Sequence, residues 1–155
     1  MSLGVEPNKA LWPAGPWHEE PDRIDWVDPV TGVPCMMRRN DFGAWCGYVA
    51  LPPTHPWAKL SRDEMAPYPH CHGGLSFNDH WEDWNPENGD MYRDVDIGTT
   101  LPWIGFDCHH GLDLGPALSS DHSDENRVYR DVQYVTAEVV HLAAHIIRVL
   151  VESKS

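Results

Sequence analysis

Basic residues are scarce in this sequence. Eleven Lys and Arg stand against 24 Asp and Glu, which gives a formal net charge of −13 over 155 residues. Proteins that bind nucleic acid through its phosphates need clustered basic side chains. The charge balance therefore argues against a nucleic-acid partner, and we expect a small-molecule ligand instead.

Signals for secretion or membrane insertion are also lacking. The segment from Met1 to Lys9 has neither a basic start nor an apolar core. No apolar run approaches the roughly 18 residues of a membrane span. The four cysteines form no CxxC pair, which favours reduced thiols or ligands over a disulfide framework. These absences predict a cytoplasmic protein that does not bind membranes.

Proline and glycine are absent from the last part of the chain. All 14 Pro and 12 Gly fall before residue 117, which predicts loops and short strands first and a helix at the end. Residues 1–21 hold four Pro and two Trp without periodicity, so we expect an irregular N-terminal arm. Residues 22–155 are long enough for a single domain with its own core.

Several short strands are predicted in the first two thirds. Residues 23–27 and 33–37 flank a turn at 28–32 and form a hairpin candidate. Pro34 suggests that the second of these strands begins at a sheet edge. Residues 58–65 favour a short helix, since Ser61 and Glu64 have the spacing of a capping box. Further strands are expected at 42–51, 72–77, 91–97 and, as the central strand, 101–108.

The last segment carries the clearest periodicity. Apolar residues from Val128 to Val149 recur at alternating spacings of four and three, which is typical of an amphipathic helix. Residues 123–125 supply the oxygen and negative charge expected at its N-terminus. The predicted fold class is α+β: a small, mainly antiparallel sheet covered by this helix, with long loops at one rim. The apolar stripe is wide enough that helix pairing in a homodimer is the alternative.

Two clusters of reactive residue types mark a candidate site. One is His70-Cys71-His72, and the other runs from Asp107 to His110, with Asp113 close behind. In a strand, residues two apart share a face, so two strands could bring imidazoles and a thiol together at one edge. That set of donors suffices for tetrahedral zinc, with His72, Cys108 and His110 as the candidate ligands.

A second interpretation needs no metal. His72 and His110 could act as general acid and base, with Asp107 or Asp113 orienting one of the rings. A third has Cys108 as a nucleophile beside a histidine, although a buried, inert thiol is the simpler interpretation of its position at the end of an apolar strand.

Neighbouring residues have the chemistry to hold a ligand. Gly73 and Gly74 let a ligand approach the backbone, and Ser76 adds a hydroxyl to the same segment. Arg130 is a bidentate donor for phosphate, although it could simply pair with an acidic neighbour. Eight Trp could fill the core, or one such as Trp103 could line a pocket and stack on a flat ligand.

Most of the other histidines have simpler explanations. His18, His55, His80 and His141 are expected to be surface or capping residues. His141 and His145 lie one helical turn apart, but without a HExxH pattern this spacing is more often incidental than a metal site.

Three motifs carry a resemblance. Cys71-His-Gly-Gly-Leu-Ser-Phe77, Gly105-Phe-Asp-Cys-His-His110 with the later Asp113, and a helix led by Tyr129-Arg-Asp131 resemble a family of small uncharacterised proteins from bacteriophages and some bacteria. The family pattern reads HGGLTY, then GFDCAH followed by Asp, then a YRD-led helix containing AEV and LA. The resemblance covers about residues 44–145.

The two departures from that pattern matter for the site. Ser76 stands where Thr is usual and keeps a hydroxyl, whereas His109 stands where Ala is usual. The resemblance therefore shifts weight from His109 to His72, Asp107, Cys108, His110 and Asp113. A phage setting implies degradation or sequestration of a host nucleotide signal. We expect hydrolysis of a small phosphate-bearing, nucleotide-like ligand; the alternatives are a binding protein without catalysis and a structural or interaction protein.

Overall fold

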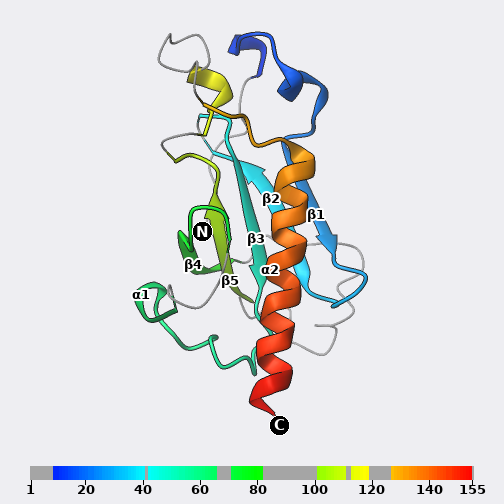
Figure 1. Ribbon diagram of the computed structural model, residues 1–155, viewed down its shortest axis with the longest axis vertical. Helices are drawn as coiled ribbons and strands as arrows, with labels where there is room; N and C mark the ends of the chain where they lie inside the picture. The colour runs from blue at the N-terminus through cyan, green and yellow to red at the C-terminus, as the bar shows by residue number, and fades with distance from the viewer. Residues whose placement is uncertain are drawn as a thin grey trace.

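The computed structural model describes residues 9–40, 42–65, 71–81, 101–110, 113–118 and 127–154. The chain forms an α+β domain in which one long helix lies along the face of an antiparallel sheet (Figure 1). Its strands and helices, in chain order, are η1 (Lys9–Leu11), η2 (Pro16–Glu19), β1 (Arg23–Val27), β2 (Pro34–Arg39), β3 (Trp45–Ala50), α1 (Arg62–Met65), β4 (Phe77–Trp81), β5 (Leu101–Asp107), η4 (Pro116–Leu118) and α2 (Val132–Ser153).

The sheet has five strands in the order β1-β2-β3-β5-β4, and every pairing is antiparallel. The predicted first hairpin is confirmed. Its turn is closed by Asp28, whose Oδ2 accepts hydrogen bonds from the Thr31 amide at 3.0 Å and the Thr31 hydroxyl at 2.6 Å. Gly32 follows with a φ of 74°, a conformation that glycine adopts without steric cost.

Two predictions about strand position are wrong. Pro34 does not mark an edge, because β2 lies between β1 and β3; proline is tolerated there as the first residue of the strand. The strand 101–108 is not central, because β3 holds the middle place and β5 lies beside it. The predicted return strand at 91–97 lies outside the described residues.

The capping box is confirmed, but its helix is shorter than predicted. The Ser61 amide donates to Glu64 Oε1 at 3.0 Å, and the Glu64 amide donates to Ser61 Oγ at 3.2 Å. Each side chain thus satisfies one free amide of the first turn. The helix that follows is a single turn, and residues 58–60 are not helical.

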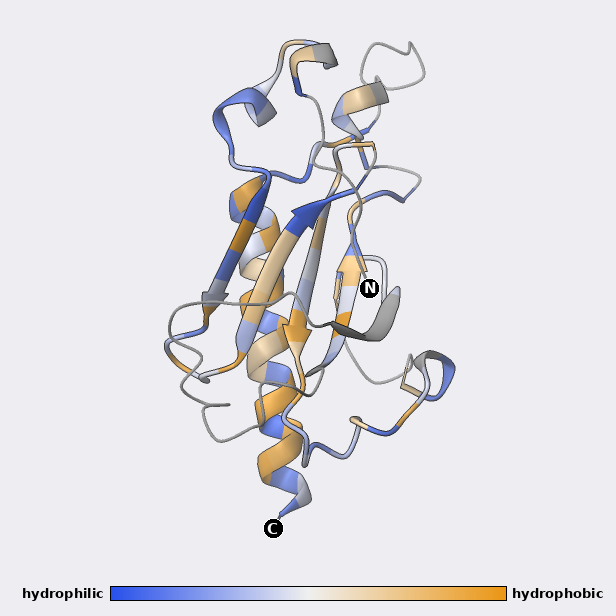
Figure 2. Ribbon diagram, turned by 180° about the vertical axis from the view of Figure 1, so that it is seen from behind, coloured by the Kyte–Doolittle hydropathy of each residue, from blue (hydrophilic) through white to orange (hydrophobic). Residues whose placement is uncertain are grey.

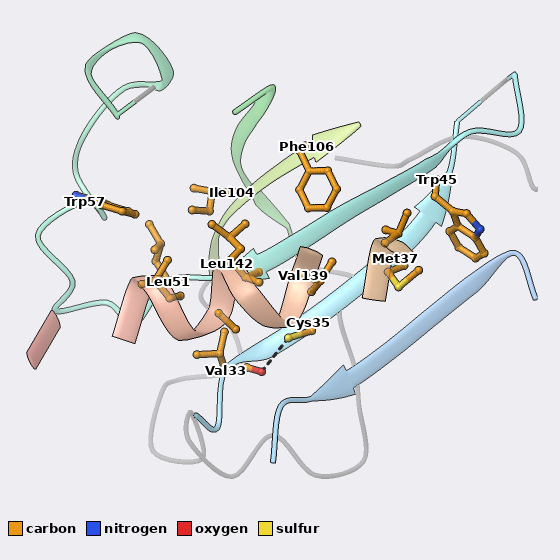
Figure 3. Close-up of a cluster of buried hydrophobic side chains, with 14 of the residues drawn as sticks. Val33, Cys35, Met37, Trp45, Leu51, Trp57, Ile104, Phe106, Val139 and Leu142 are labelled. Carbon is orange, nitrogen blue, oxygen red and sulfur yellow. Dashed lines mark hydrogen bonds between the residues drawn. The ribbon is translucent and has the colours of Figure 1, made fainter. Parts of the chain in front are cut away.

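The long helix packs on the sheet, as its periodicity predicts. Its apolar face lies over β2 and β3 and meets side chains from both (Figure 3). Seen from behind, the strands lie in front of the helix (Figure 2). Gly47 makes the close approach possible, because a Cβ there would lie 2.5 Å from Val139 and 2.6 Å from Phe106. The buried helix residues are Val135, Val139, Leu142, Ala143, Ile146 and Leu150.

The start of α2 differs from the prediction. Asp131 is its N-cap and accepts a hydrogen bond from the Tyr134 amide at 2.8 Å, so the helix begins at Val132. Val128, the first residue of the predicted stripe, precedes the helix and is 50% exposed. Residues 123–125, predicted to open the helix, lie outside the described residues.

Within the described part of the chain, α2 is the one helix that is long and apolar enough to cross a membrane by length and composition alone. No such segment was expected from the sequence. In the structure, one face of α2 is buried against the sheet.

His55, expected to be a surface or capping residue, is buried and accepts a hydrogen bond from a local backbone amide. His55 is 3% exposed, and its Nε2 lies 2.8 Å from the carbonyl oxygen of Ile146 in α2. Its Nδ1 accepts a hydrogen bond from the Trp57 amide at 3.0 Å. Since Nδ1 accepts, Nε2 must donate, and the buried ring is the neutral Nε2–H tautomer. His55 therefore ties the segment after β3 to the second half of α2.

Candidate functional site

His72 lies in a turn rather than in a strand. Strand β4 begins only at Phe77, and the turn from Cys71 is closed by a hydrogen bond from the Gly74 amide to the Cys71 carbonyl at 2.9 Å. The prediction of a strand at 72–77 is wrong because Gly73 and Gly74 have positive φ values of 68° and 85°, which a β-strand does not contain. His70 lies outside the described residues.

The second cluster begins where β5 ends. Asp107 is the last strand residue, so the expected alternation of faces does not continue through His110. Asp107 Oδ1 accepts from the His109 amide at 3.1 Å, and the Asp113 amide donates to the His110 carbonyl at 2.9 Å. Both bonds fold the segment back on itself at the strand end. This end of β5 lies beside the His72 turn, because the Ser76 amide donates to the Gly105 carbonyl at 2.9 Å.

Asp113 joins three parts of the chain. Its Oδ2 lies 2.7 Å from His72 Nε2 and accepts from the His110 amide at 3.0 Å. Its Oδ1 accepts from Arg130 Nε at 3.0 Å. The residue is 2% exposed, so these are contacts of a buried carboxylate. The structure therefore brings the two sequence clusters together around Asp113, with Arg130 as a third partner.

The Asp113 carboxylate is held in its ionised form. Burial alone raises its pKa, but hydrogen bonds from the His72 ring, the His110 amide and the Arg130 guanidinium outweigh burial and lower the pKa below the ordinary value. The same contact raises the pKa of Arg130. An ionised carboxylate can only accept hydrogen bonds, so His72 Nε2 carries a hydrogen and donates the hydrogen bond to Asp113.

The other nitrogen of His72 faces Tyr134. His72 Nδ1 lies 2.7 Å from the Tyr134 hydroxyl, which in turn lies 3.1 Å from Glu138 Oε1. The tyrosine has one proton to share between these two neighbours. When His72 is neutral, its Nδ1 accepts a hydrogen bond from the tyrosine hydroxyl. When His72 is doubly protonated, Nδ1 donates to the hydroxyl instead, and the hydroxyl donates to Glu138. Desolvation and the Glu138 charge raise the pKa of Tyr134, which keeps it protonated.

Arg130 is only partly used by these contacts. Its Nε binds Asp113, and its guanidinium carbon lies 4.9 Å from the centre of the Tyr134 ring. Its side chain is 27% exposed. Among the described residues, its two terminal nitrogens have no hydrogen-bond partner. Terminal guanidinium nitrogens can bind an anion such as phosphate.

His110 is the exposed member of the cluster. Its side chain is 41% exposed, and its Nε2 lies 3.2 Å from Oδ1 of the partly exposed Asp107. Its ring lies against Gly73, where a Cβ would come within 2.1 Å of Nε2. The His110 and His72 rings are 5.7 Å apart, measured between centroids. Within the described part of the chain, His110 Nδ1 has no hydrogen-bond partner.

Three of the predicted site residues bring no side-chain group to this cluster. Trp103 is fully buried in a second apolar group on the sheet face away from α2, together with Tyr48. Ser76 enters only through its backbone, because no hydrogen bond of its hydroxyl occurs among the described residues. Gly74 faces open space, since a Cβ there would meet nothing within 4 Å.

The predicted zinc ligands do not form a binding set. Both ring nitrogens of His72 are engaged by Tyr134 and Asp113. Cys108 is 1% exposed within the apolar core, where burial first and the Asp113 charge second raise the pKa of its thiol. Over the described ranges, no three His, Cys, Asp or Glu side chains are grouped so as to hold a metal ion. In the part of the chain that the structure describes, the donors of this site do not fit zinc.

The burial of Cys108 and the raised pKa of its thiol also argue against a role as nucleophile. A reactive cysteine needs a thiolate and access to substrate. Desolvation in the core disfavours the thiolate, and the burial of the side chain prevents access. Cys71 is less buried, but desolvation raises its pKa to about 12. The chemistry of this site therefore rests on imidazole, carboxylate and guanidinium groups.

Sequence reasoning missed Tyr134 and Glu138. Tyr134 and Glu138 lie four residues apart on α2, beside its apolar stripe, and Arg130 precedes them by four residues just before the N-cap. That polar line next to the buried face was the available signal. A comparison with models of known protein families, a search of curated proteins and a search of solved structures found no match to this chain.

Proposed function

We propose that this protein hydrolyses a small phosphate-bearing, nucleotide-like ligand and that His110 is its general base. The observation that carries the proposal is the Asp107–His110 pair, in which Nε2 of an exposed imidazole lies 3.2 Å from the Asp107 carboxylate and Nδ1 has no partner among the described residues. An acceptor on one side of an imidazole fixes the proton there and leaves the other nitrogen basic. The negative charge of Asp107, 3.2 Å from Nε2, favours the proton on that nitrogen.

The proposed step follows from this geometry. His110 Nδ1 takes a proton from a water molecule, and the water oxygen forms a new bond to phosphorus. The bond from phosphorus to the leaving oxygen breaks, and the proton held by His110 passes to that oxygen. The His110 amide and the packing of the ring on Gly73 hold the base in place, because Asp113 accepts from the amide at 3.0 Å.

Arg130 supports a phosphate as the group that is held. It and His110 are both hydrogen-bonded to the Asp113 carboxylate, one on each oxygen, so they flank the same anchor. Terminal guanidinium nitrogens are suited to bidentate contact with phosphate oxygens. In this proposal His72 is a positioning residue, since both of its nitrogens are occupied and it acts through Asp113. The resemblance to a phage and bacterial family favours a host nucleotide signal as the ligand.

The test is hydrolysis of a panel of nucleoside mono-, di- and triphosphates and dinucleotides, with products separated by chromatography. His110→Ala should lower turnover by roughly 100-fold or more, which is the usual size of a general-base contribution. Asp107→Asn should lower it to a smaller extent. His109→Ala is the matched control, because His109 lies on Phe42, with ring centroids 4.6 Å apart, and should leave turnover unchanged.

A binding protein that sequesters the nucleotide is the second candidate. It is favoured by the full engagement of His72 and by the terminal nitrogens of Arg130, which have no partner among the described residues. Wild-type protein that binds a nucleotide without turning it over would support it. Unchanged turnover in His110→Ala would overturn the general base. Neither binding nor turnover across the panel would overturn both functions and leave the structural role.

A further inference from the structure

A second polar cluster, outside the candidate site, surrounds the carboxylate of Glu20. One oxygen, Oε1, accepts from Arg39 Nη2 at 3.2 Å, from Trp45 Nε1 at 3.5 Å and from the Tyr129 hydroxyl. The other, Oε2, accepts from the Val132 amide at 3.0 Å. Four donors from three separate parts of the chain thus converge on one carboxylate that comes from the N-terminal arm.

The donors are held in place without Glu20. The Arg39 side chain is fully buried and also donates to the Gly43 carbonyl at 2.9 Å and to Asp22 Oδ1 at 2.9 Å. Its guanidinium carbon lies 4.3 Å from the centre of the Trp45 ring, and Trp45 is itself fully buried. The cation and the indole N–H would therefore keep their positions if the Glu20 carboxylate were absent.

The local charges favour an anion at this position. Arg39 and Lys9 supply two positive charges, and Asp22 binds both of them, at 2.9 Å and 3.2 Å. Glu20 is the second negative charge of the group. Removing the Glu20 carboxylate leaves two cations with one anion, so the vacated space would carry one uncompensated positive charge beside a free helix amide.

We propose that Arg39, Trp45, Tyr129 and the Val132 amide form a carboxylate-binding pocket whose resident ligand is Glu20 of the chain's own arm. The arm thereby occupies a preformed anion site at the start of α2. A small carboxylate supplied in solution occupies the same pocket when Glu20 is replaced.

The arm also contacts the domain through residues other than Glu20. Loss of the Glu20 carboxylate is therefore distinct from loss of the arm's packing on the domain. Trp17 is 4% exposed, and its ring meets that of Tyr129 edge to face with centroids 5.1 Å apart. Its Nε1 donates to the Pro13 carbonyl at 2.9 Å. With Trp17 and Asp22 still in place, a Glu20→Ala variant keeps the walls of the pocket and loses only its ligand.

The test is chemical rescue of full-length Glu20→Ala by acetate. The melting temperature is measured in about 100 mM sodium acetate and in sodium chloride of equal ionic strength and pH. We expect acetate to raise the melting temperature of the variant by roughly 3 °C over chloride, because binding to the folded state alone stabilises it. Wild type and Glu19→Ala, which changes the neighbouring carboxylate of the arm, should show no difference between the two salts.

Equal melting temperatures of Glu20→Ala in acetate and in chloride would overturn the proposal. If the variant fails to fold in chloride, the readout becomes recovery of soluble monomer after refolding in each salt. Recovery in acetate alone would then support the pocket, and failure in both salts would overturn it. Adding Tyr129→Phe to Glu20→Ala should reduce the acetate effect, since one of the four donors is then lost.

Discussion

His72 Nε2 and Asp113 Oδ2 lie 2.7 Å apart, although 41 residues separate them in the chain. This contact joins the turn before β4 to the segment after β5, and the same carboxylate reaches Arg130 just before α2. Because Asp113 is 2% exposed, its partners compensate for the loss of water around a charged group.

Replacing Asp113 should therefore destabilise the fold more than replacing an exposed carboxylate nearby. We expect Asp113→Asn to lower the free energy of unfolding by about 2–3 kcal/mol, because charge-assisted hydrogen bonds to His72, His110 and Arg130 are lost together. Asp107→Asn, whose side chain is 32% exposed, should cost less than about 1 kcal/mol. Urea unfolding at pH 7 measures both, and similar losses in the two variants would contradict this account.

Asp113 should also make the free energy of unfolding depend on pH in acid. The folded state lowers the pKa of Asp113, so the unfolded state binds its proton first as the pH falls through the ordinary value of 3.8. The stabilisation from Asp113 is therefore fully present above that value and is lost below it. Urea unfolding between pH 5 and pH 3, in Asp113→Asn against wild type, should show a smaller fall in stability for the variant.

His55 should make stability depend on pH in a higher window. Burial first, and the nearby His145 second, lower the pKa of His55 from 6.5 despite its hydrogen bond to Ile146. The folded protein thus prefers the neutral ring, so stability should rise as the pH increases towards and past 6.5 and be lost as the pH falls below it. Unfolding free energies across this range should vary less in His55→Gln than in wild type. His141→Gln, an exposed change on α2, should keep the wild-type slope.

Gly73 and Gly74 offer a matched pair. Both have positive φ, so Ala at either position should cost about 1–2 kcal/mol from backbone strain. A Cβ at Gly73 would also strike the His110 ring at 2.1 Å, whereas one at Gly74 would meet nothing within 4 Å. We expect Gly73→Ala alone to shift the His110 ring signals in an NMR spectrum and to lose turnover. Equal shifts in both variants would contradict the close packing of His110 on Gly73.

Gly47 sets the distance between α2 and the sheet. A Cβ at this position would lie 2.5 Å from Val139 and 2.6 Å from the Phe106 ring, both fully buried. Gly47→Ala should therefore lower the free energy of unfolding by about 1–3 kcal/mol through overpacking, despite the better strand propensity of alanine. A second change, Val139→Ala, should recover part of that loss because it removes the clashing methyl groups. Urea unfolding of the single and double variants measures this, and a double variant less stable than the sum of the two changes would be inconsistent with relief of a clash.

The sequence by itself determined the elements that depend on local pattern. The spacing of apolar residues from Val135 to Leu150 predicted the terminal helix and its buried face, and Asp28 to Gly32 predicted the first turn. Ser61 and Glu64 predicted a helix start. Each of these depends on neighbours within a few residues, so the chain order alone contains the information.

Only the tertiary structure decided the site. His72 lies in a glycine turn and not on a strand face, and Asp113 joins it to the second cluster. The burial of His55 and the capping of α2 by Glu20, 112 residues earlier, likewise left no local signal. Buried polar groups take whichever partners the packing of distant segments brings within reach, and that packing is set by the whole sheet and helix together rather than by any short stretch of sequence.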